Sequence, residues 1–304
     1  TMLIAEQPGP LESAHSFTKR TAGAETNFAI GMARLGLRVA WASRLGNDSL
    51  GRYLLAEMKR EGVDCSKVVA DAAQRTGFLF KGRVLDGSDP PIEYHREGSA
   101  ASRMGADDVD VDWLLTARHL HSTGVFAAVS ASTLEASRKS MDTMRAAGRS
   151  ISFDTNLRPT LWPSAEVMRH EINDLAARAD WVLPGIEEGL LLTGESTPEG
   201  VAHFYRGLGA KLVVVKLGAD GAYFDSAIDG QEGSGWVPGY PVAEVIDTVG
   251  AGDGFAAGVV SALLEGKAVI DAVRRGAWIG ARAVQVLGDT EGLPTRFELM
   301  AAGF

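Results

Sequence analysis

The segment Asp247–Phe255 (DTVGAGDGF) follows an apolar run and opens a small-residue, very apolar stretch that should be helical. Its glycines allow a tight turn, so that N–H groups at the start of the helix can point at phosphate oxygens or at developing negative charge. Asp253 lies in the first turn of that helix, beside the same spot. Its carboxylate could accept the proton of an attacking hydroxyl, as in other phosphoryl transfers. The segment therefore predicts an anion cradle with its own general base.

Glycines at this spacing also occur in other nucleotide-binding motifs and in purely structural turns. A dinucleotide fingerprint needs a third glycine at position 255, which is Phe255, and this argues against an NAD-dependent oxidoreductase. The phosphate-binding pattern G-x-x-x-x-G-K-[ST] does not occur in the sequence. A purely structural turn capped by an aspartate remains open on this segment alone.

Composition narrows the class of protein. The 304 residues are 45% hydrophobic and 23% charged, which is ordinary for a globular protein. Thirty basic residues against 39 acidic ones give a net charge of −9, which disfavours nucleic-acid or anionic-membrane partners because these need a basic face. Cys65 is the only cysteine, so an internal disulfide and a paired-thiolate metal site are excluded. We expect a cytoplasmic protein, without a leader or a membrane span.

Short apolar runs alternate with helical patterns along most of the chain. This alternation predicts a mostly parallel sheet with helices on both faces, and substrates in such folds bind beyond the carboxyl ends of the strands. The predicted strands are 38–43, 119–122, 150–154, 181–184, 212–217 and 242–246, and the predicted helices are 26–35, 47–60, 131–147, 165–177 and 255–264.

Two segments do not show this alternation of strands and helices. Residues 1–21 and about 74–100 are typical of short antiparallel strands, with a turn over residues 86–91. We interpret them together as a small β-sheet lid over the edge of the active site, although an ordinary hairpin excursion explains them equally well at this point. Without a linker or an internal repeat, residues 1–304 are predicted to form a single domain with a lid.

A family resemblance rests on two long motifs. Ala22–Gly36 (AGAETNFAIGMARLG), continued by Leu45–Gly51 (LGNDSLG), resembles the first signature of the ribokinase (PfkB) carbohydrate kinases, and Asp247–Asp253 resembles the second. The likeness covers essentially the whole chain. It implies a Rossmann-like αβα sandwich with a β-lid that uses ATP and Mg²⁺, with a monovalent cation as a further option. It also implies that Asp253 is the catalytic base and that Gly250, Ala251 and Gly252 form the anion hole.

Substrate features resemble the 2-keto-3-deoxygluconate kinase group of this family. Asp154–Trp162 (DTNLRPTLW) is similar to an N-L-R-P…L-W run of that group and of some fructokinases. A guanidinium just past a strand end suits a bidentate grip on a carboxylate, so a sugar acid explains Arg158 better than a neutral hexose does. In the lid, Tyr94 and Arg96 are spaced to share one face of a strand, and the resemblance implies that both face the substrate.

Other site residues are carried over by the resemblance alone. Glu188 is implied to be linked to magnesium, although Gly185 stands where many relatives have the Asn of an N-x-x-E motif, and Leu79 replaces a substrate-facing Tyr of some relatives. The likeness also leads us to expect a strand before Thr1. The implied substrate contacts are Gly23, Asn27 and Asp289, and the implied ATP contacts are Asn156, Lys216, Gly218, Gly221 and Thr248.

The predicted reaction is ATP plus 2-keto-3-deoxygluconate giving ADP and the 6-phosphate, in a homo-oligomeric enzyme. The nearest alternative is the same chemistry on fructose, ribose or another sugar. An alternative of a different class is a non-catalytic sugar- or nucleotide-sensing protein built on the same fold.

Overall fold

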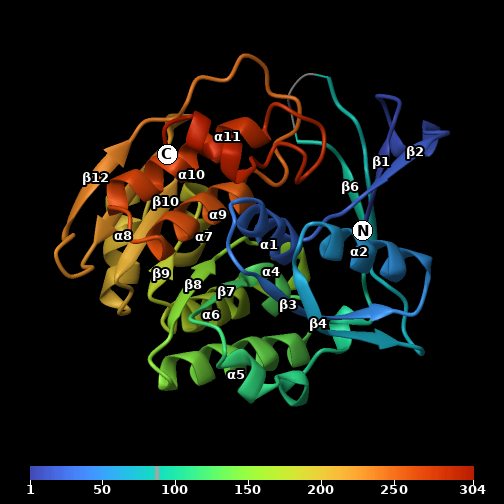
Figure 1. Cartoon of the computed structure of the whole chain (residues 1–304), viewed down its shortest axis with the longest axis horizontal. Coiled ribbons are helices and arrows are strands. Elements are labelled where there is room, and N and C mark those ends of the chain that lie inside the picture. The colour runs from blue at the N-terminus through green and yellow to red at the C-terminus, as the bar shows by residue number, and fades with distance from the viewer. Residues whose placement is uncertain (86–88) are drawn as a thin grey trace. The chain divides into compact units, whose positions relative to one another are not determined.

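The apolar runs in the middle of the chain form a six-stranded sheet in the order β12-β11-β10-β9-β8-β7 (Figure 1). Strands β7 to β10 are parallel to one another, and β11 and β12 add antiparallel pairs at one side. Side chains of β8 and β10, such as Phe153 and Val214, are completely buried, as expected for a sheet covered on both faces. The strands are β7 (His119–Thr123), β8 (Ser150–Asp154), β9 (Trp181–Val182), β10 (Leu212–Lys216), β11 (Ala222–Ser226) and β12 (Gly233–Val237).

Helices pack on this sheet through one continuous apolar core. Met141 and Met144 of α5, Ile172 of α6 and Tyr205 of α8 are fully buried in it together with Phe153. Each of these helices begins at a side-chain cap: Ser130 for α5, Ser164 for α6 and Thr197 for α8. The helices of this region are α3 (Val111–Leu114), α4 (Gly124–Ala127), α5 (Ala131–Ala146), α6 (Ala165–Ala176), α7 (Ile186–Thr193) and α8 (Pro198–Gly207).

A second sheet has four strands in the order β2-β1-β5-β6. Its members are β1 (Met2–Ala5), β2 (Phe17–Arg20), β5 (Phe78–Lys81) and β6 (Ile92–His95). The β1–β2 and β5–β6 pairs are antiparallel as predicted, but β1 and β5 are parallel, so the expectation of antiparallel pairing throughout was wrong. The chain makes a long excursion between β2 and β5, and such a connection allows either direction.

That excursion contains α1 (Ala24–Arg34), α2 (Ser49–Arg60) and a parallel pair of strands, β3 (Ala40–Gly46) and β4 (Asp64–Asp71). The carboxylate of Asp48 accepts a hydrogen bond from the Gly51 N–H at 2.8 Å and caps α2 as predicted. The apolar faces of these elements share a core centred on buried side chains such as Met58.

The C-terminal part of the chain supplies α9 (Ala251–Leu264), α10 (Val269–Ala283) and α11 (Arg296–Ala301). The strand predicted at 242–246 does not form. Val245 and Ile246 are each 40% exposed, and the Ile246 N–H donates at 2.7 Å to the carbonyl of Val284, which lies just beyond the end of α10. An apolar run without a neighbouring strand to pair with stays an extended loop. Helix α9 begins four residues before the predicted start at 255, so the glycine turn itself enters the helix.

This computed structural model describes residues 1–85 and 89–304. Part of the turn predicted at 86–91 therefore lies outside the described residues. Within them, no helix is both long and apolar enough to cross a membrane. The chain divides into two compact units. The first unit comprises Thr1–Arg103, Tyr240–Ser261 and Trp278–Phe304, and the second unit comprises Met104–Gly239 and Ala262–Ala277.

Candidate active site

The glycine turn before α9 is shaped by contacts that exclude larger side chains. Gly250 has a φ of +86°, and a Cβ atom there would lie 2.4 Å from the carbonyl oxygen of Asp289. The Gly254 N–H makes a 2.9 Å bond to the Gly250 carbonyl and so starts the helical ladder. The N–H groups just before it, from Ala251 to Asp253, belong to the helix terminus, where donors have no intrahelical acceptor and the partial charge is positive. This turn can therefore stabilise an anion.

Asp253 in this first turn is held by a side chain from α1. The Asn27 amide Nδ2 donates to Asp253 Oδ2 at 2.8 Å and to Asp289 Oδ2 at 3.3 Å. Asn27 is itself fixed in the first turn of α1 by a 2.8 Å bond from its N–H to the Gly23 carbonyl. The structure thus brings together Gly23, Asn27, Gly250, Asp253 and Asp289, which lie far apart in the sequence.

The side-chain oxygen of Asn27 indicates that a ligand binds at this site. Because Nδ2 faces two carboxylates, Oδ1 must face away from them, and this buried oxygen finds no hydrogen-bond partner among the residues that the structure describes. A buried acceptor without a donor costs free energy. A ligand hydroxyl that donates to Oδ1 would satisfy it.

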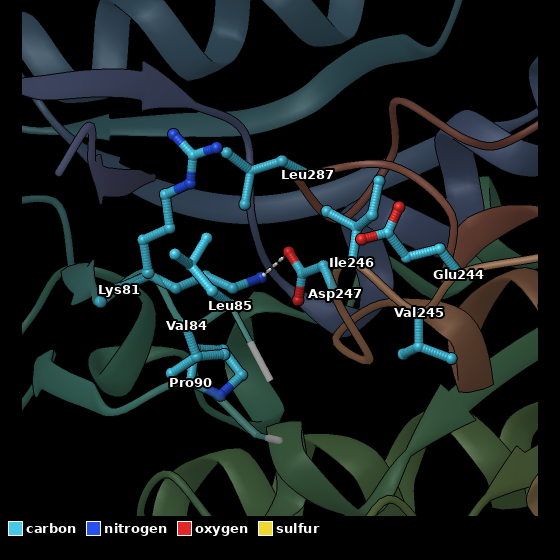
Figure 2. A pocket seen from close by; sticks show the side chains of 11 residues that line it. Lys81, Val84, Leu85, Pro90, Glu244, Val245, Ile246, Asp247 and Leu287 are labelled. Carbon is cyan, nitrogen blue, oxygen red and sulfur yellow. Dashed lines mark hydrogen bonds and ion pairs between the residues drawn. The ribbon is translucent and has the colours of Figure 1, made fainter. Parts of the chain in front are cut away.

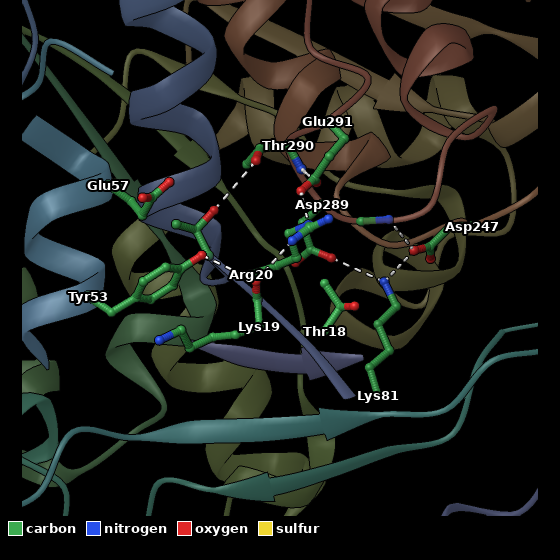
Figure 3. Close-up of polar contacts among 12 residues, drawn as sticks. Thr18, Lys19, Arg20, Tyr53, Glu57, Lys81, Asp247, Asp289, Thr290 and Glu291 are labelled. Atoms are coloured by element: carbon green, nitrogen blue, oxygen red, sulfur yellow. Dashed lines mark hydrogen bonds and ion pairs between the residues drawn. The ribbon is translucent and has the colours of Figure 1, made fainter. Parts of the chain in front are cut away.

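Lys81 completes this polar cluster, and the sequence analysis did not identify it. Its Nζ lies 2.5 Å from Asp247 Oδ2 and 3.1 Å from Asp289 Oδ1, and the side chain is fully buried (Figures 2 and 3). Asp247 also accepts hydrogen bonds from the N–H groups of Val249 and Gly288. Burial raises the pKa of Asp289, and the ammonium of Lys81 opposes that shift.

On the four-stranded sheet, Tyr94 and Arg96 lie together as their spacing predicts. The Arg96 guanidinium carbon stands 4.2 Å from the centre of the Tyr94 ring. Leu79 is the direct partner of Tyr94 across the β5–β6 ladder. The tyrosine that some relatives have would therefore stand beside Tyr94, and its place is taken here by an aliphatic side chain.

The second unit contains a separate polar cluster around the N-L-R-P segment. Both carboxylate oxygens of Glu188 are engaged, by Thr155 Oγ1 at 2.7 Å, the Leu157 N–H at 2.7 Å and the Gly185 N–H at 2.8 Å. Burial alone would raise the pKa of Glu188, but Lys216 and these three donors outweigh it and leave the pKa below its usual value. Through its bonds from Thr155 and Leu157, this carboxylate holds the loop that carries Arg158 in place.

The same loop is under local strain. Asn156 has a φ of +33°, a backbone angle that residues other than glycine rarely adopt. Its N–H donates a hydrogen bond to Asp154 Oδ1 at 3.1 Å. Lys216 Nζ, at the end of β10, lies 2.8 Å from each carboxylate oxygen of Asp154, at the end of β8; strand β9 lies between these two strands. Arg158 donates to the Leu157 carbonyl at 2.7 Å and is half-buried.

The remaining predicted nucleotide residues fall in both units. In the second unit, Gly221 (φ +98°) cannot be replaced without strain, because a Cβ atom there would meet the Val237 carbonyl at 2.1 Å, whereas Gly218 (φ +60°) faces open space. In the first unit, Thr248 Oγ1 donates to Asp89 Oδ1 at 2.5 Å. Roles in ATP binding stay predictions for all of these residues.

Comparison with known proteins now decides the family. The sequence model described as "pfkB family carbohydrate kinase" matches residues 1–296. The chain belongs to the pfkB family of carbohydrate kinases. It is 49% identical to the 2-dehydro-3-deoxygluconokinase of Bacillus subtilis (strain 168), over 98% of this chain and 91% of that protein. The predicted family and ribokinase-like fold are thereby confirmed.

Two solved structures are similar to this pfkB kinase throughout. A PfkB protein from Polaromonas sp. JS666 is 69% identical, with a TM-score of 0.90 and coverage of 99% of this chain and 96% of that one. A putative ribokinase II from E. coli, solved in complex with ATP and Mg²⁺, is 27% identical with a TM-score of 0.90 and covers 99% of this chain and 94% of its own. ATP and Mg²⁺ are therefore the expected phosphoryl donor and metal of this kinase.

The anion turn of this pfkB kinase fits the phosphate oxygens of a nucleotide. The anion turn at Gly250–Gly252 offers N–H donors to phosphate oxygens. Within residues 1–85 and 89–304, no three His, Cys, Asp or Glu side chains gather as a ready metal site. Glu188 is occupied by three protein donors, and its link to magnesium stays a prediction.

Proposed function

We propose that this pfkB kinase transfers the terminal phosphoryl group of ATP to the 6-hydroxyl of 2-keto-3-deoxygluconate. The pair formed by Asp253 and Asn27 at the anion turn is the observation that carries the chemistry. The choice of substrate is supported by the 49% identity to a kinase of that name and by Arg158, whose guanidinium suits the carboxylate of a sugar acid.

Proton transfer is assigned to Asp253. The Asn27 amide holds the carboxylate of Asp253, which receives the proton of the 6-hydroxyl, while the buried Asn27 Oδ1 accepts a hydrogen bond from another hydroxyl of the sugar. The sugar oxygen forms a bond to the γ-phosphorus, and the bond to the bridging oxygen of ADP breaks. Negative charge that develops on the phosphoryl oxygens is stabilised by the N–H groups of Gly250–Gly252. Mg²⁺ bound with ATP would supply further charge neutralisation.

Contacts with the sugar acid are assigned for each unit by itself. In the second unit, the carboxylate is assigned to Arg158. In the first unit, contacts with the sugar are assigned to Gly23, Asp289 and the Tyr94–Arg96 pair. Closure of the four-stranded sheet as a lid would exclude water and limit hydrolysis of ATP. ATP contacts are assigned to Asn156, Lys216, Gly218, Gly221 and Thr248. Cytoplasmic location, homo-oligomerisation and a monovalent-cation requirement stay predictions.

A panel of sugars tests this proposal directly. Release of ADP by the purified enzyme with ATP and Mg²⁺ is measured for 2-keto-3-deoxygluconate, its galactonate-derived epimer, fructose and ribose. We expect kcat/KM to be at least about tenfold higher for a keto-deoxy sugar acid than for either neutral sugar, because one charged contact contributes about 1.5–3 kcal/mol. A preference for fructose or ribose would make the enzyme a neutral-sugar kinase. Binding of sugar and ATP without any ADP release would favour the non-catalytic alternative.

A further inference from the structure

Lys81 is a fully buried cation, and such burial is unusual for a lysine. It is the last residue of β5, after three partly buried apolar side chains, and its Nζ contacts carboxylates from two distant segments. Figure 2 shows it with Asp247 in the wall of a small cavity of about 150 Å³. Lysine is almost never fully buried unless it is paired. No motif that identified the family includes it.

The two segments that Lys81 contacts both adjoin the anion turn. Asp247 precedes the anion turn, and Asp289 follows α10 and packs under Gly250. Asp289 in turn accepts a hydrogen bond from Asn27, and Asn27 donates to Asp253. A continuous path of polar contacts therefore runs from the β5 ammonium through Asp289 and Asn27 to the catalytic carboxylate. Figure 3 shows its first step, from Lys81 to Asp289.

We propose that Lys81 is a positioning residue that fixes Asp247 and Asp289 and, through Asn27, orients Asp253 for catalysis. The proposal deepens the proposed kinase function and rests on it. It also links the lid sheet to the anion turn, because the same side chain belongs to β5 and reaches the residue before that turn.

The physical reason is the charge balance of the cluster. Asp247 and Asp289 are both buried, and Lys81 is the cation that contacts both. Burial already pushes the pKa of Asp289 up, and the ammonium holds it down. Without the ammonium, Asp289 would take up a proton and lose its attraction for the Asn27 NH₂ group. The Asn27 NH₂ group would then lose one of the two carboxylates that orient it, so its hydrogen bond to Asp253 would be held less firmly in the geometry that catalysis needs.

The first test compares Lys81→Met, which keeps length without charge, with Lys81→Arg, which keeps the charge. We expect Lys81→Met to lower kcat by about ten- to a hundredfold at pH 7 with little change in the KM for ATP, as for other misplaced catalytic groups. Its acid limb of kcat/KM should move to higher pH by about one unit, because a neighbouring cation shifts a carboxyl pKa by about that much. Activity should recover in part at high pH and in Lys81→Arg.

A matched control is Arg275→Met, which breaks a different buried ion pair. Arg275 is 2% exposed and contacts Glu265 at 2.9 Å in the second unit. This variant should lower the melting temperature while leaving kcat and the acid limb of the surviving enzyme unchanged. If Lys81→Met behaves like this control, with stability lost and the pH profile unmoved, Lys81 is a structural clamp and the proposal is overturned.

Two further measurements keep the result decisive. If Lys81→Met does not fold, the double variant Lys81→Met, Asp247→Asn removes one of the two stranded carboxylates, and the same alkaline shift is expected because Asp289 still lacks its cation. An NMR titration of ¹³C-labelled aspartate, with the Asp289 signal assigned by its loss in Asp289→Asn, needs no substrate. A higher pKa for Asp289 in Lys81→Met supports the coupling even if the sugar panel rejects the proposed substrate, and an unchanged pKa refutes it.

Discussion

Asp253 and Asn27 stand 226 positions apart in the sequence and share one hydrogen bond of 2.8 Å. Asp253→Asn keeps an oxygen that can accept this bond, so the fold should survive while the proton acceptor is lost. We expect kcat to fall by about 10²–10⁴, the usual contribution of a positioned base. Steady-state kinetics checks the loss, and nucleotide titration should show ATP affinity retained. Asp229→Asn, at an exposed carboxylate, serves as the control; a kcat within threefold of wild type in Asp253→Asn would remove the assigned base.

Arg158 is the residue on which the choice of a sugar acid depends most. Loss of one charged hydrogen-bonding partner costs about 1.5–3 kcal/mol, which corresponds to roughly a ten- to hundredfold rise in the KM for the sugar acid in Arg158→Ala. The KM for ATP should stay within about twofold of wild type because the contact is specific to the carboxylate. Arg149→Ala changes an exposed arginine of the same unit and should alter neither constant. An unchanged sugar KM in Arg158→Ala would reject the carboxylate grip.

At the scale of elements, apolar periodicity predicted most of the fold. The strand at Ser150–Asp154 was predicted with both ends correct, and α5 and α6 within one residue, because each has its own apolar pattern and cap. The strand predicted at 242–246 does not form because a strand also needs a neighbouring strand, which the local sequence does not specify. Lys81 was missed for a similar reason, since its two carboxylates lie 166 and 208 residues away.

The motifs predicted which residues gather around Asp253 better than they predicted what holds them. Gly23, Asn27 and Asp289 do meet in the first unit, although Asp289 lies more than 260 residues after the segment that holds the other two. The support under the Arg158 loop was not foreseen, because two of the three donors that Glu188 receives, Thr155 and Leu157, reach it only through the packing of α7 against that loop. Supporting contacts of this kind are properties of the folded chain.

Glu188 offers a prediction about that loop as an element. Glu188→Ala would leave three donors without their acceptor, and each buried donor left unpaired costs about 1–3 kcal/mol. The melting temperature should therefore fall, and Arg158 should be positioned less firmly. We expect the sugar KM to rise severalfold while the Mg²⁺ concentration for half-maximal rate stays unchanged. Glu187→Ala, at the exposed neighbour, is the control. A large shift in Mg²⁺ dependence with a normal sugar KM would instead establish the metal role predicted from the family.

At the scale of the whole molecule, a partly buried histidine pair links stability to pH. His119 Nδ1 and Nε2 lie 2.8 Å from the hydroxyls of Ser150 and Ser152, its ring stacks on Trp181 at 4.9 Å, and His121 Nδ1 shares the Ser152 hydroxyl at 2.8 Å. Burial lowers the pKa of His119 to about 3 and also lowers the pKa of His121. Both imidazoles are therefore neutral in the folded chain near neutral pH.

These histidines bind protons more readily once the chain unfolds, where their pKa returns to about 6.5. Their contribution to stability is complete above pH 6.5 and is lost as the pH falls toward the folded value, because only the unfolded state gains protons in that window. Well below pH 6.5 each histidine should lower the free energy of unfolding by about 1.4 kcal/mol per pH unit. Urea unfolding between pH 5 and 8 measures this slope. The double variant His119→Gln, His121→Gln should flatten it, whereas His15→Gln should not; equal slopes in the double variant and the wild type would show that other groups cause the acid sensitivity.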